Sequence, residues 1–314
     1  MTSITDNGEL IYGMQLPIQT LSRSLRVEWE DQASVADLRD IAEECDASPM
    51  SFIGVCDHIA IPDDSYSAKM TTTWYDTVAT LGYLAAATDR IRLLSVVLVA
   101  AYRHPLQIAK AFGTLDHLSG GRAILGVGAG HVENEFKALG IDFHSRGKLL
   151  DETLRAVRAA FEKPYVSFEG EHFAYDKVGI APQPRDDLPI WVGGMGKAAW
   201  RRTGELGDGY IPMGNQLDSY PEIIEIIRSS AANAGRSDAT FDIGWMPGLF
   251  YVGEPGFDAG PWSTTGTPEQ LADSLRNARA VGINTVHLRF ANRSKAELIH
   301  QIQAFGETVW PLVN

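Results

Sequence analysis

Short apolar runs alternate along the whole chain with segments in which apolar residues recur every three to four positions. Runs of strand length predict eight strands, at residues 11–16, 52–55, 91–99, 122–127, 189–192, 209–213, 241–252 and 285–290. Segments with helical spacing follow these runs, at residues 35–45, 74–87, 106–118, 149–161, 197–206, 220–232, from 267 onwards and 298–309. Helix signals support two of the starts, because Pro105 suits a first helical position and Thr267-Pro268-Glu269 combines a cap, a proline and an acidic residue.

Eight units of strand followed by helix predict an α/β fold of the (β/α)8 type, a TIM-type barrel in a single domain covering residues 1–314. About 250 residues suffice for such a barrel. The excess predicts insertion loops near 165–187 and 253–267, and residues 1–9 are expected to be disordered. An open doubly wound sheet is the alternative topology, and it accommodates eight such units less naturally.

Composition and charge indicate which classes of molecule the protein is expected to bind. The formal net charge of −13 makes nucleic acid and anionic membranes poor partners, and a small-molecule substrate is expected instead. Cys45 and Cys56 are the two cysteines, too few for a disulfide framework, and no apolar run approaches membrane-spanning length. The N-terminus carries no signal-peptide core. A cytoplasmic location is therefore expected.

Two of the predicted strands are each followed by a candidate functional segment: one by a titratable pair and the other by a glycine-rich loop. Asp57-His58 comes directly after the strand at 52–55, where a barrel places its active site. The loop at 126–130 carries three glycines, and His131 and Asn134 follow it at once. The simpler interpretations are that Asp57 caps the next turn and that the glycines form a tight turn. An NAD site of the Rossmann type is rejected, because no acidic residue follows on a second strand about 20 residues later.

A third candidate, Gly193-Gly194-Met195-Gly196, joins a strand to a helix. Backbone N–H groups at a helix start, together with the charge of Lys197, favour a phosphate there. The simpler interpretation is a glycine-rich turn. The histidines have no metal-ligand spacing, and neither a cysteine cluster nor a Gly-x-Ser-x-Gly motif is present, so a metal site or a serine nucleophile is unsupported. A cofactor-free isomerase or aldolase barrel that handles a phosphate remains an alternative.

Taken together, these motifs resemble the bacterial luciferase-like monooxygenase superfamily. The resemblance rests on Asp57-His58, Arg103-His104-Pro105, the segment 118–122, the loop 126–130 with Glu135-Phe136, and the segment 189–194. It implies a TIM-type barrel that binds FMN or the deazaflavin coenzyme F420. The segment 57–62 is most similar to the F420 branch, and homodimers are common in the family.

The resemblance also implies roles for individual residues. His58 would orient a group or donate a proton at the reaction centre, and Asp57 would touch the cofactor ring. A non-prolyl cis peptide is expected at Ser95-Val96, as a bulge behind the ring. Residues expected around the cofactor are Gly128, Ala129, Gly130 and Asn134, with Gly193, Gly194, Met195 and Gly196 at its phosphate.

Two positions depart from the deazaflavin-dependent sugar-phosphate dehydrogenases. Pro62 and His131 stand where those enzymes have tryptophan and glutamate. Glucose 6-phosphate is therefore not the expected substrate, and His131 becomes a candidate acid or substrate contact. The simpler interpretation of His131 is a solvent-facing residue at a helix start.

The sequence thus favours an F420-dependent oxidoreductase that moves a hydride between the deazaflavin and a small organic substrate. Two alternatives from the same family stay open. One is an FMN-dependent monooxygenase that uses reduced flavin and oxygen. The other is a flavin- or deazaflavin-binding protein without catalysis.

Overall fold

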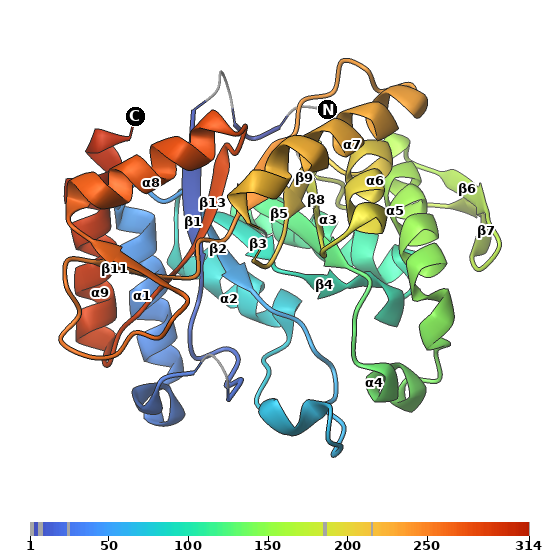
Figure 1. The fold of residues 1–314 in the computed structure, drawn as a ribbon. Helices are drawn as coiled ribbons and strands as arrows, with labels where there is room; N and C mark the ends of the chain where they lie inside the picture. Colours follow the sequence, from blue (N-terminus) through green and yellow to red (C-terminus); the bar gives the residue numbers. More distant parts are fainter. Residues whose placement is uncertain (1–2, 6–8, 24–25, 185–186, 215, 314) are drawn as a thin grey trace.

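The computed structural model describes residues 3–5, 9–23, 26–184, 187–214 and 216–313. Within these residues, parallel strands close into a barrel, and each strand is hydrogen-bonded to the next (Figure 1). In order around the barrel they are β1 (Ile11–Gln15), β2 (Phe52–Val55), β3 (Arg92–Ser95), β5 (Ala123–Gly128), β8 (Ile190–Gly193), β9 (Gly209–Ile211), β10 (Asp242–Trp245) and β13 (Thr285–Phe290). The parallel pairing of β13 with β1 closes the ring. The predicted (β/α)8 barrel is confirmed, and the open sheet is excluded.

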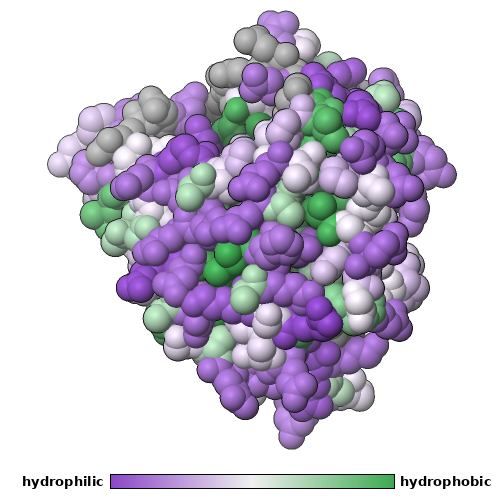
Figure 2. Space-filling model, turned by 90° about the vertical axis from the view of Figure 1, so that its left-hand side faces the viewer, coloured by the Kyte–Doolittle hydropathy of each residue, from purple (hydrophilic) through white to green (hydrophobic). Residues whose placement is uncertain are grey.

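Helices surround the barrel, and every barrel strand is followed by one. They are α1 (Val35–Ala47), α2 (Thr77–Ala87), α3 (Pro105–Ser119), α5 (Arg146–Glu162), α6 (Lys197–Leu206), α7 (Tyr220–Asn233), α8 (Pro268–Ala280) and α9 (Lys295–Ala304). The predicted cap at Thr267 is present, because its side chain accepts a hydrogen bond from the backbone N–H of Gln270. On the face that carries α1 and α9, hydrophilic side chains dominate and hydrophobic ones are scattered (Figure 2).

The barrel interior has its own apolar cluster, separate from the larger core between strands and helices. Phe52, Leu94, Ile124, Trp191 and Ile211 form this inner cluster. All five side chains are at most 2% exposed, so the barrel is filled and encloses no channel at this level.

Asp242 closes the amino-terminal end of the barrel. Its carboxylate accepts hydrogen bonds from the backbone N–H groups of Ile4 and Thr5, both at 3.0 Å, and from the indole of Trp191 at 2.9 Å. Residues 3–5 of the N-terminal stretch are therefore held in place, which differs from the disorder expected for residues 1–9. Residues 1–2 and 6–8 lie outside the described part of the chain.

The predicted strand at 91–99 is interrupted. A non-prolyl cis peptide joins Val96 to Val97 and separates β3 from β4 (Leu98–Val99). The expected position, Ser95-Val96, is wrong by one residue. Ser95 remains part of the sheet, since its hydroxyl donates to the carbonyl of Gly126 at 2.8 Å and accepts from the N–H of Gly126 at 3.0 Å.

Both expected insertions contain strands of their own. The first holds an antiparallel hairpin of β6 (Val166–Glu169) and β7 (Ala174–Val178). The predicted strand at 241–252 divides into β10 and β11 (Leu249–Val252), and β12 (Ser263–Gly266) in the second insertion pairs with β11. A short helix missed by periodicity, α4 (Glu133–Ala138), lies between β5 and α5. None of the described helices is both long and apolar enough to cross a lipid bilayer.

Candidate active site

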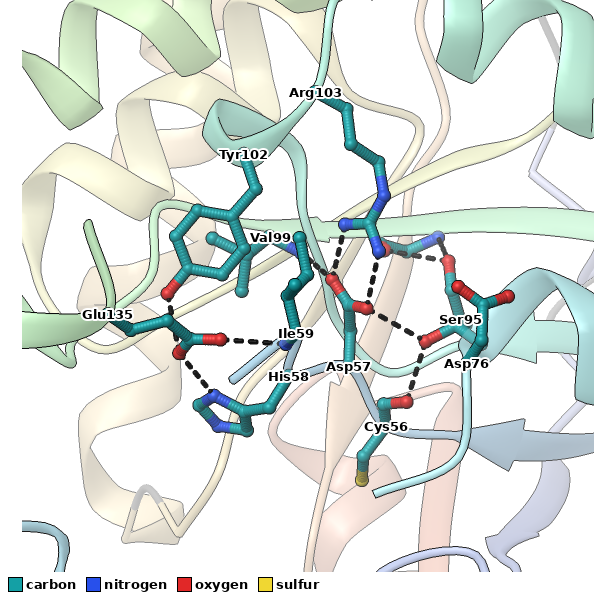
Figure 3. A network of polar contacts seen from close by, with 12 residues as sticks. Cys56, Asp57, His58, Ile59, Asp76, Ser95, Val99, Tyr102, Arg103 and Glu135 are labelled. Carbon is teal, nitrogen blue, oxygen red and sulfur yellow. Dashed lines mark hydrogen bonds and ion pairs between the residues drawn. The ribbon is translucent and has the colours of Figure 1, made fainter. Parts of the chain in front are cut away.

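The carboxyl ends of β2, β4 and β5 bring a set of polar side chains together at one edge of the barrel. Asp57 and His58 follow β2, Arg103 follows β4, and Glu135 comes from α4 after β5. Figure 3 shows Glu135 between Tyr102 and His58, and Asp57 facing Arg103. The structure therefore assembles two separate polar clusters, one around Glu135 and one around Asp57.

Glu135 is the hub of the first cluster, and its side chain is fully buried. One carboxylate oxygen lies 2.7 Å from Nδ1 of His58 and accepts from the Tyr102 hydroxyl at 2.8 Å. The other oxygen accepts from the backbone N–H groups of Ile59 at 2.7 Å and Ala60 at 3.0 Å. Because a carboxylate only accepts, Nδ1 of His58 carries the hydrogen, and Nε2 is left to exchange a proton.

Electrostatics keep Glu135 ionised. Burial raises the pKa of Glu135, but the hydrogen bonds from His58, Ala60 and Tyr102 outweigh it, and the pKa lies below its usual value. Burial and the neighbouring Glu135 charge raise the pKa of Tyr102 well above its usual range. Tyr102 therefore stays a hydrogen-bond donor to the Glu135 carboxylate at neutral pH.

Asp57 is the hub of the second cluster. Its carboxylate accepts two hydrogen bonds from Arg103, at 2.7 and 2.8 Å, and one from the Val99 N–H at 2.9 Å. The hydroxyl of Thr77 adds a contact at 3.2 Å. With its side chain only 1% exposed, Asp57 ties the end of β2 to the segment after β3. The ring contact implied by the resemblance stays a prediction.

Val96 and Val97 form a half-buried apolar surface at the same edge. Three glycines make room for them: a Cβ at Gly54 would lie 2.6 Å from Val96, and a Cβ at Gly128 or Gly193 would lie 2.5 Å from Val97. The glycines at 128 and 193 are therefore needed where the chain packs against this bulge. Ala129 and Gly130 follow as half-buried residues.

His131 lies beside His58, with ring centroids 5.7 Å apart. Nδ1 of His131 is 3.0 Å from the Tyr66 hydroxyl, and the ring of Trp74 also packs against His58, with 4.4 Å between centroids. Partial desolvation of the ring and the neighbouring His58 lower the pKa of His131. The residue as a whole is exposed, as its simpler interpretation expects, and its role as an acid or substrate contact stays a prediction.

Asn134 contacts the loop after β2. Its side-chain amide donates to Asp64 at 2.6 Å. This contact holds the loop after β2 against the start of α4. The expected reach of Asn134 towards a cofactor therefore stays a prediction.

The glycine turn before α6 has the form of an anion site. Gly194 and Gly196 have positive φ angles of 121° and 114°, and no side chain caps the helix. Met195 is 68% exposed, and Nζ of Lys197 lies 3.5 Å from Glu222, which offsets part of its charge. The backbone N–H groups at the start of α6 are therefore the main donors available here.

The three predicted turns follow β2, β5 and β8, and they share the carboxyl edge of the barrel because β2, β3, β5 and β8 pair in parallel in this order. The sequence predicts roles for His58, Ala129 and Gly194 but none for Glu135, Tyr102 or Trp74. Glu135 lies on a six-residue helix that is too short to show periodicity. Among the described residues, no group of three or more His, Cys, Asp or Glu side chains is arranged to hold a metal ion.

Comparison with known proteins agrees with this architecture. The F420-dependent glucose-6-phosphate dehydrogenase of Kineococcus radiotolerans is 30% identical over 222 residues, which are 68% of this chain and 63% of that enzyme. The match thus spans less than two thirds of that relative's length. The FMNH(2)-dependent dimethylsulfone monooxygenase of Pseudomonas fluorescens is 22% identical over 76% of this chain and 78% of its own length.

A solved F420-dependent secondary alcohol dehydrogenase, in complex with an F420–acetone adduct, superposes with a TM-score of 0.78. It is 18% identical over 98% of this chain and 99% of its own, so it supports the fold alone. The sequence profile of the luciferase-like monooxygenases matches residues 21–259, which is most of the barrel and includes both polar clusters. The chain therefore belongs to the luciferase-like monooxygenase family.

Proposed function

We propose that this protein is an F420-dependent oxidoreductase that transfers a hydride between the deazaflavin and a small organic substrate. The relative from Kineococcus radiotolerans, named as F420-dependent, supports the choice of coenzyme. The observation that carries the proposal is the fixed imidazole of His58. A buried carboxylate holds its Nδ1 at 2.7 Å, at the edge of the barrel where enzymes of this architecture work.

The residues at this edge fit a flat ring with an anionic tail. Val96, Val97 and Ala129 are partly exposed apolar residues that follow strands at the same edge of the barrel as His58. A Cβ at Gly196 would meet nothing within 4 Å, so the turn before α6 has open space next to its backbone donors. We therefore assign the ring to the Val96–Val97 surface and the phosphate to the residues 193–196.

When bound, a deazaflavin supplies the hydride chemistry, accepting or returning a hydrogen with its two electrons. The side chains of the protein take up and return the proton that accompanies the hydride. For oxidation of an alcohol, Nε2 of His58 would take the hydroxyl proton as the carbon loses its hydride, and it would return that proton in the reverse direction. Glu135 stabilises the imidazolium that forms, and Tyr102 fixes the carboxylate.

Titration of the purified protein with F420 and, separately, with FMN tests the coenzyme by fluorescence. Saturable binding of F420, much tighter than that of FMN, is expected. The His58→Ala variant should keep F420 affinity within about twofold and lose turnover by about 10²-fold or more, since a positioned general acid or base contributes that much. Bleaching of bound F420 by candidate alcohols is the activity readout.

An FMN-dependent monooxygenase is the second candidate, supported by the Pseudomonas fluorescens relative. Tight FMN binding without affinity for F420 would establish this alternative and end the present proposal. F420 binding without turnover on a broad panel of alcohols, aldehydes and ketones would favour a binding protein without catalysis.

A further inference from the structure

A cavity of about 280 Å³ lies at the carboxyl ends of β1 and β13. Gln15 and Phe290, the last residues of these two strands, contribute to its wall. Val27, ahead of α1, lines another side, and Phe257 comes from the loop between β11 and β12. The second insertion therefore contributes to a binding space, and this space is at the same face of the barrel as His58.

The cavity borders the segment that carries His58. β1 and β2 are neighbours in the barrel, with Gln15 beside Gly54. The side-chain amide of Gln15 donates to Sγ of Cys56 at 3.0 Å, and Cys56 immediately precedes Asp57-His58. A molecule in the cavity would therefore lie one strand away from the proposed reaction centre.

Two of the arginines in the cavity lining are paired with carboxylates that lie outside it. The lining contains five charged side chains: Arg26, Arg289, Arg293, Glu30 and Asp258. Arg26 forms an ion pair with Asp31. Arg293 pairs with Glu297 at 2.8 Å, and its guanidinium also lies over the ring of Phe257, 4.8 Å from the centroid. Each of these two arginines therefore has its own counter-charge.

The third arginine, Arg289, has its counter-charge inside the lining. Burial lowers the pKa of the Arg289 guanidinium, and the charge of the nearby Glu30 carboxylate opposes this shift. Glu30 is 2% exposed, and it accepts hydrogen bonds from the N–H groups of Ile18 at 2.9 Å and Val27 at 3.0 Å. Buried charges are stable when an opposite charge and hydrogen-bond donors replace the lost water. Arg289 and Glu30 therefore compensate each other without a charged ligand.

These pairs leave ligands of either charge without a counter-charge. With Asp31 and Glu297 included, the charged groups around the cavity are three arginines and four carboxylates. The exposed Asp258 accepts a hydrogen bond from the N–H of Gly260 at 2.8 Å. An anion would meet arginines that are already paired, and a cation would meet carboxylates that are already engaged. Because an ion would lose hydration without compensation, the lining favours a neutral ligand.

Gln15 supplies a neutral polar group to this cavity. Asn292, the other amide in the lining, uses both of its ends, because Oδ1 accepts from the indole of Trp29 at 2.7 Å and Nδ2 donates to the carbonyl of Phe290 at 2.9 Å. Gln15 is 6% exposed, and its Nε2 is engaged with Cys56. Within the described part of the chain, no group donates a hydrogen bond to Oε1 of Gln15. This oxygen can therefore accept a hydrogen bond from a ligand.

The rest of the wall is largely apolar and includes Leu249, Phe257, Phe290 and Leu298. We propose that this cavity binds a small neutral molecule with a hydroxyl group, which donates a hydrogen bond to Oε1 of Gln15 while the apolar wall surrounds its body. A volume of about 280 Å³ lies just below the roughly 300–1,000 Å³ of sites for drug-sized ligands, which limits the body to a short aliphatic chain or a single ring. The inference that this molecule is the substrate rests on the proposed function. The binding itself does not.

Three probes of equal chain length test the charge preference on the 314-residue chain at pH 7: 1-hexanol, hexanoate and hexylamine, each titrated by calorimetry and by ligand-observed NMR. 1-Hexanol is expected to bind saturably, and each ion at least about tenfold more weakly, because neither ion gains a counter-charge for the water it loses. Preferred binding of either ion, or the absence of saturable hexanol binding at millimolar concentrations, would overturn the proposal.

Methyl pentyl ether tests the hydrogen bond to Gln15, because it has the same number of non-hydrogen atoms as 1-hexanol but cannot donate. Hexanol should bind about threefold to tenfold more tightly than the ether, the range expected for one neutral hydrogen bond. In Gln15→Met the alcohol should lose this advantage while the ether keeps its affinity. Gln303→Met changes an exposed glutamine of α9 outside the lining and should retain the advantage. A folded Gln15→Met protein that still prefers the alcohol contradicts the assignment.

Ala259→Phe locates the binding independently of Gln15. It fills the cavity from the loop between β11 and β12 without changing a charge, so hexanol and the ether should weaken alike. Unchanged affinity for hexanol in this variant, once circular dichroism has shown that it is folded, would place the binding elsewhere and end the proposal.

F420 titration of the same proteins separates this proposal from that of the coenzyme. Intact F420 binding without a preference for the neutral probe contradicts only the cavity. Failed F420 binding with selective binding of hexanol contradicts only the coenzyme.

Discussion

At the scale of single residues, the orientation of His58 depends on one carboxylate 77 positions away. Glu135 joins this imidazole to two backbone N–H groups and to the hydroxyl of Tyr102. A carboxylate in this position does two things for a histidine: it selects the tautomer, and it stabilises the charged form. Glu135 is thus a positioning residue that acts through His58.

Replacing Glu135 by Gln should lower kcat by about 10- to 100-fold, because the imidazolium loses its counter-charge, while the F420 affinity stays unchanged. Steady-state kinetics and F420 titration measure the two quantities separately. Tyr102→Phe keeps the charge and removes one hydrogen bond, so its loss of kcat should be smaller than that of Glu135→Gln. A Glu135→Gln enzyme with wild-type kcat would refute this role.

At the scale of elements, a glycine allows the neighbouring strands β3 and β5 to approach each other closely. Gly126 lies inside β5, and a Cβ there would overlap the carbonyl oxygen of Ser95. Gly82 lies in α2, where a Cβ would meet nothing within 4 Å. The same substitution at the two positions should therefore have opposite effects on stability.

Gly126→Ala is expected to lower the free energy of unfolding by about 1–3 kcal/mol or more, because the backbone of β3 has to shift. Gly82→Ala should raise it by about 0.5–1 kcal/mol, since alanine is the better helix former. Urea unfolding followed by circular dichroism measures both variants. Equal effects of the two substitutions on the free energy of unfolding would show that β3 and β5 can accommodate a side chain at Gly126 without cost.

At the scale of the whole molecule, the filled barrel encloses one imidazole for which the structure shows no hydrogen-bond partner. His287 is 1% exposed, and neither of its ring nitrogens has a partner among the described residues. Burial, with a smaller contribution from Arg289, lowers the pKa of His287 from 6.5 to about 4. Between pH 6.5 and about 4, His287 is therefore neutral in the folded barrel and protonated in the unfolded chain.

Below pH 6.5 the unfolded state gains this proton first, so stability should fall as the pH drops towards about 4. The full effect amounts to about 3 kcal/mol. His287→Leu removes the titrating group and should flatten this part of the pH dependence. Urea unfolding of both proteins at pH 7 and pH 4.5 measures the difference, and parallel losses of stability would contradict the assignment to His287.

Much of the fold follows from local pattern. The strands at 52–55 and 285–290 and the helix at 197–206 have the predicted bounds, because their apolar spacing and flanking turn residues agree. The position of the cis peptide does not follow from local pattern. Ser95, Val96 and Val97 are all strand-compatible, and contacts with β5 and with three distant glycines accompany the bulge in the folded barrel.

The sequence by itself determined the barrel and located three turns that lie at one edge of it, because these depend on residues close together in the chain. Only the tertiary structure decided that Glu135 holds His58 and that Asp57 is bound to Arg103. These contacts join residues far apart in sequence. Their partners are set by the closure of the ring, which brings together strand ends that no local pattern relates.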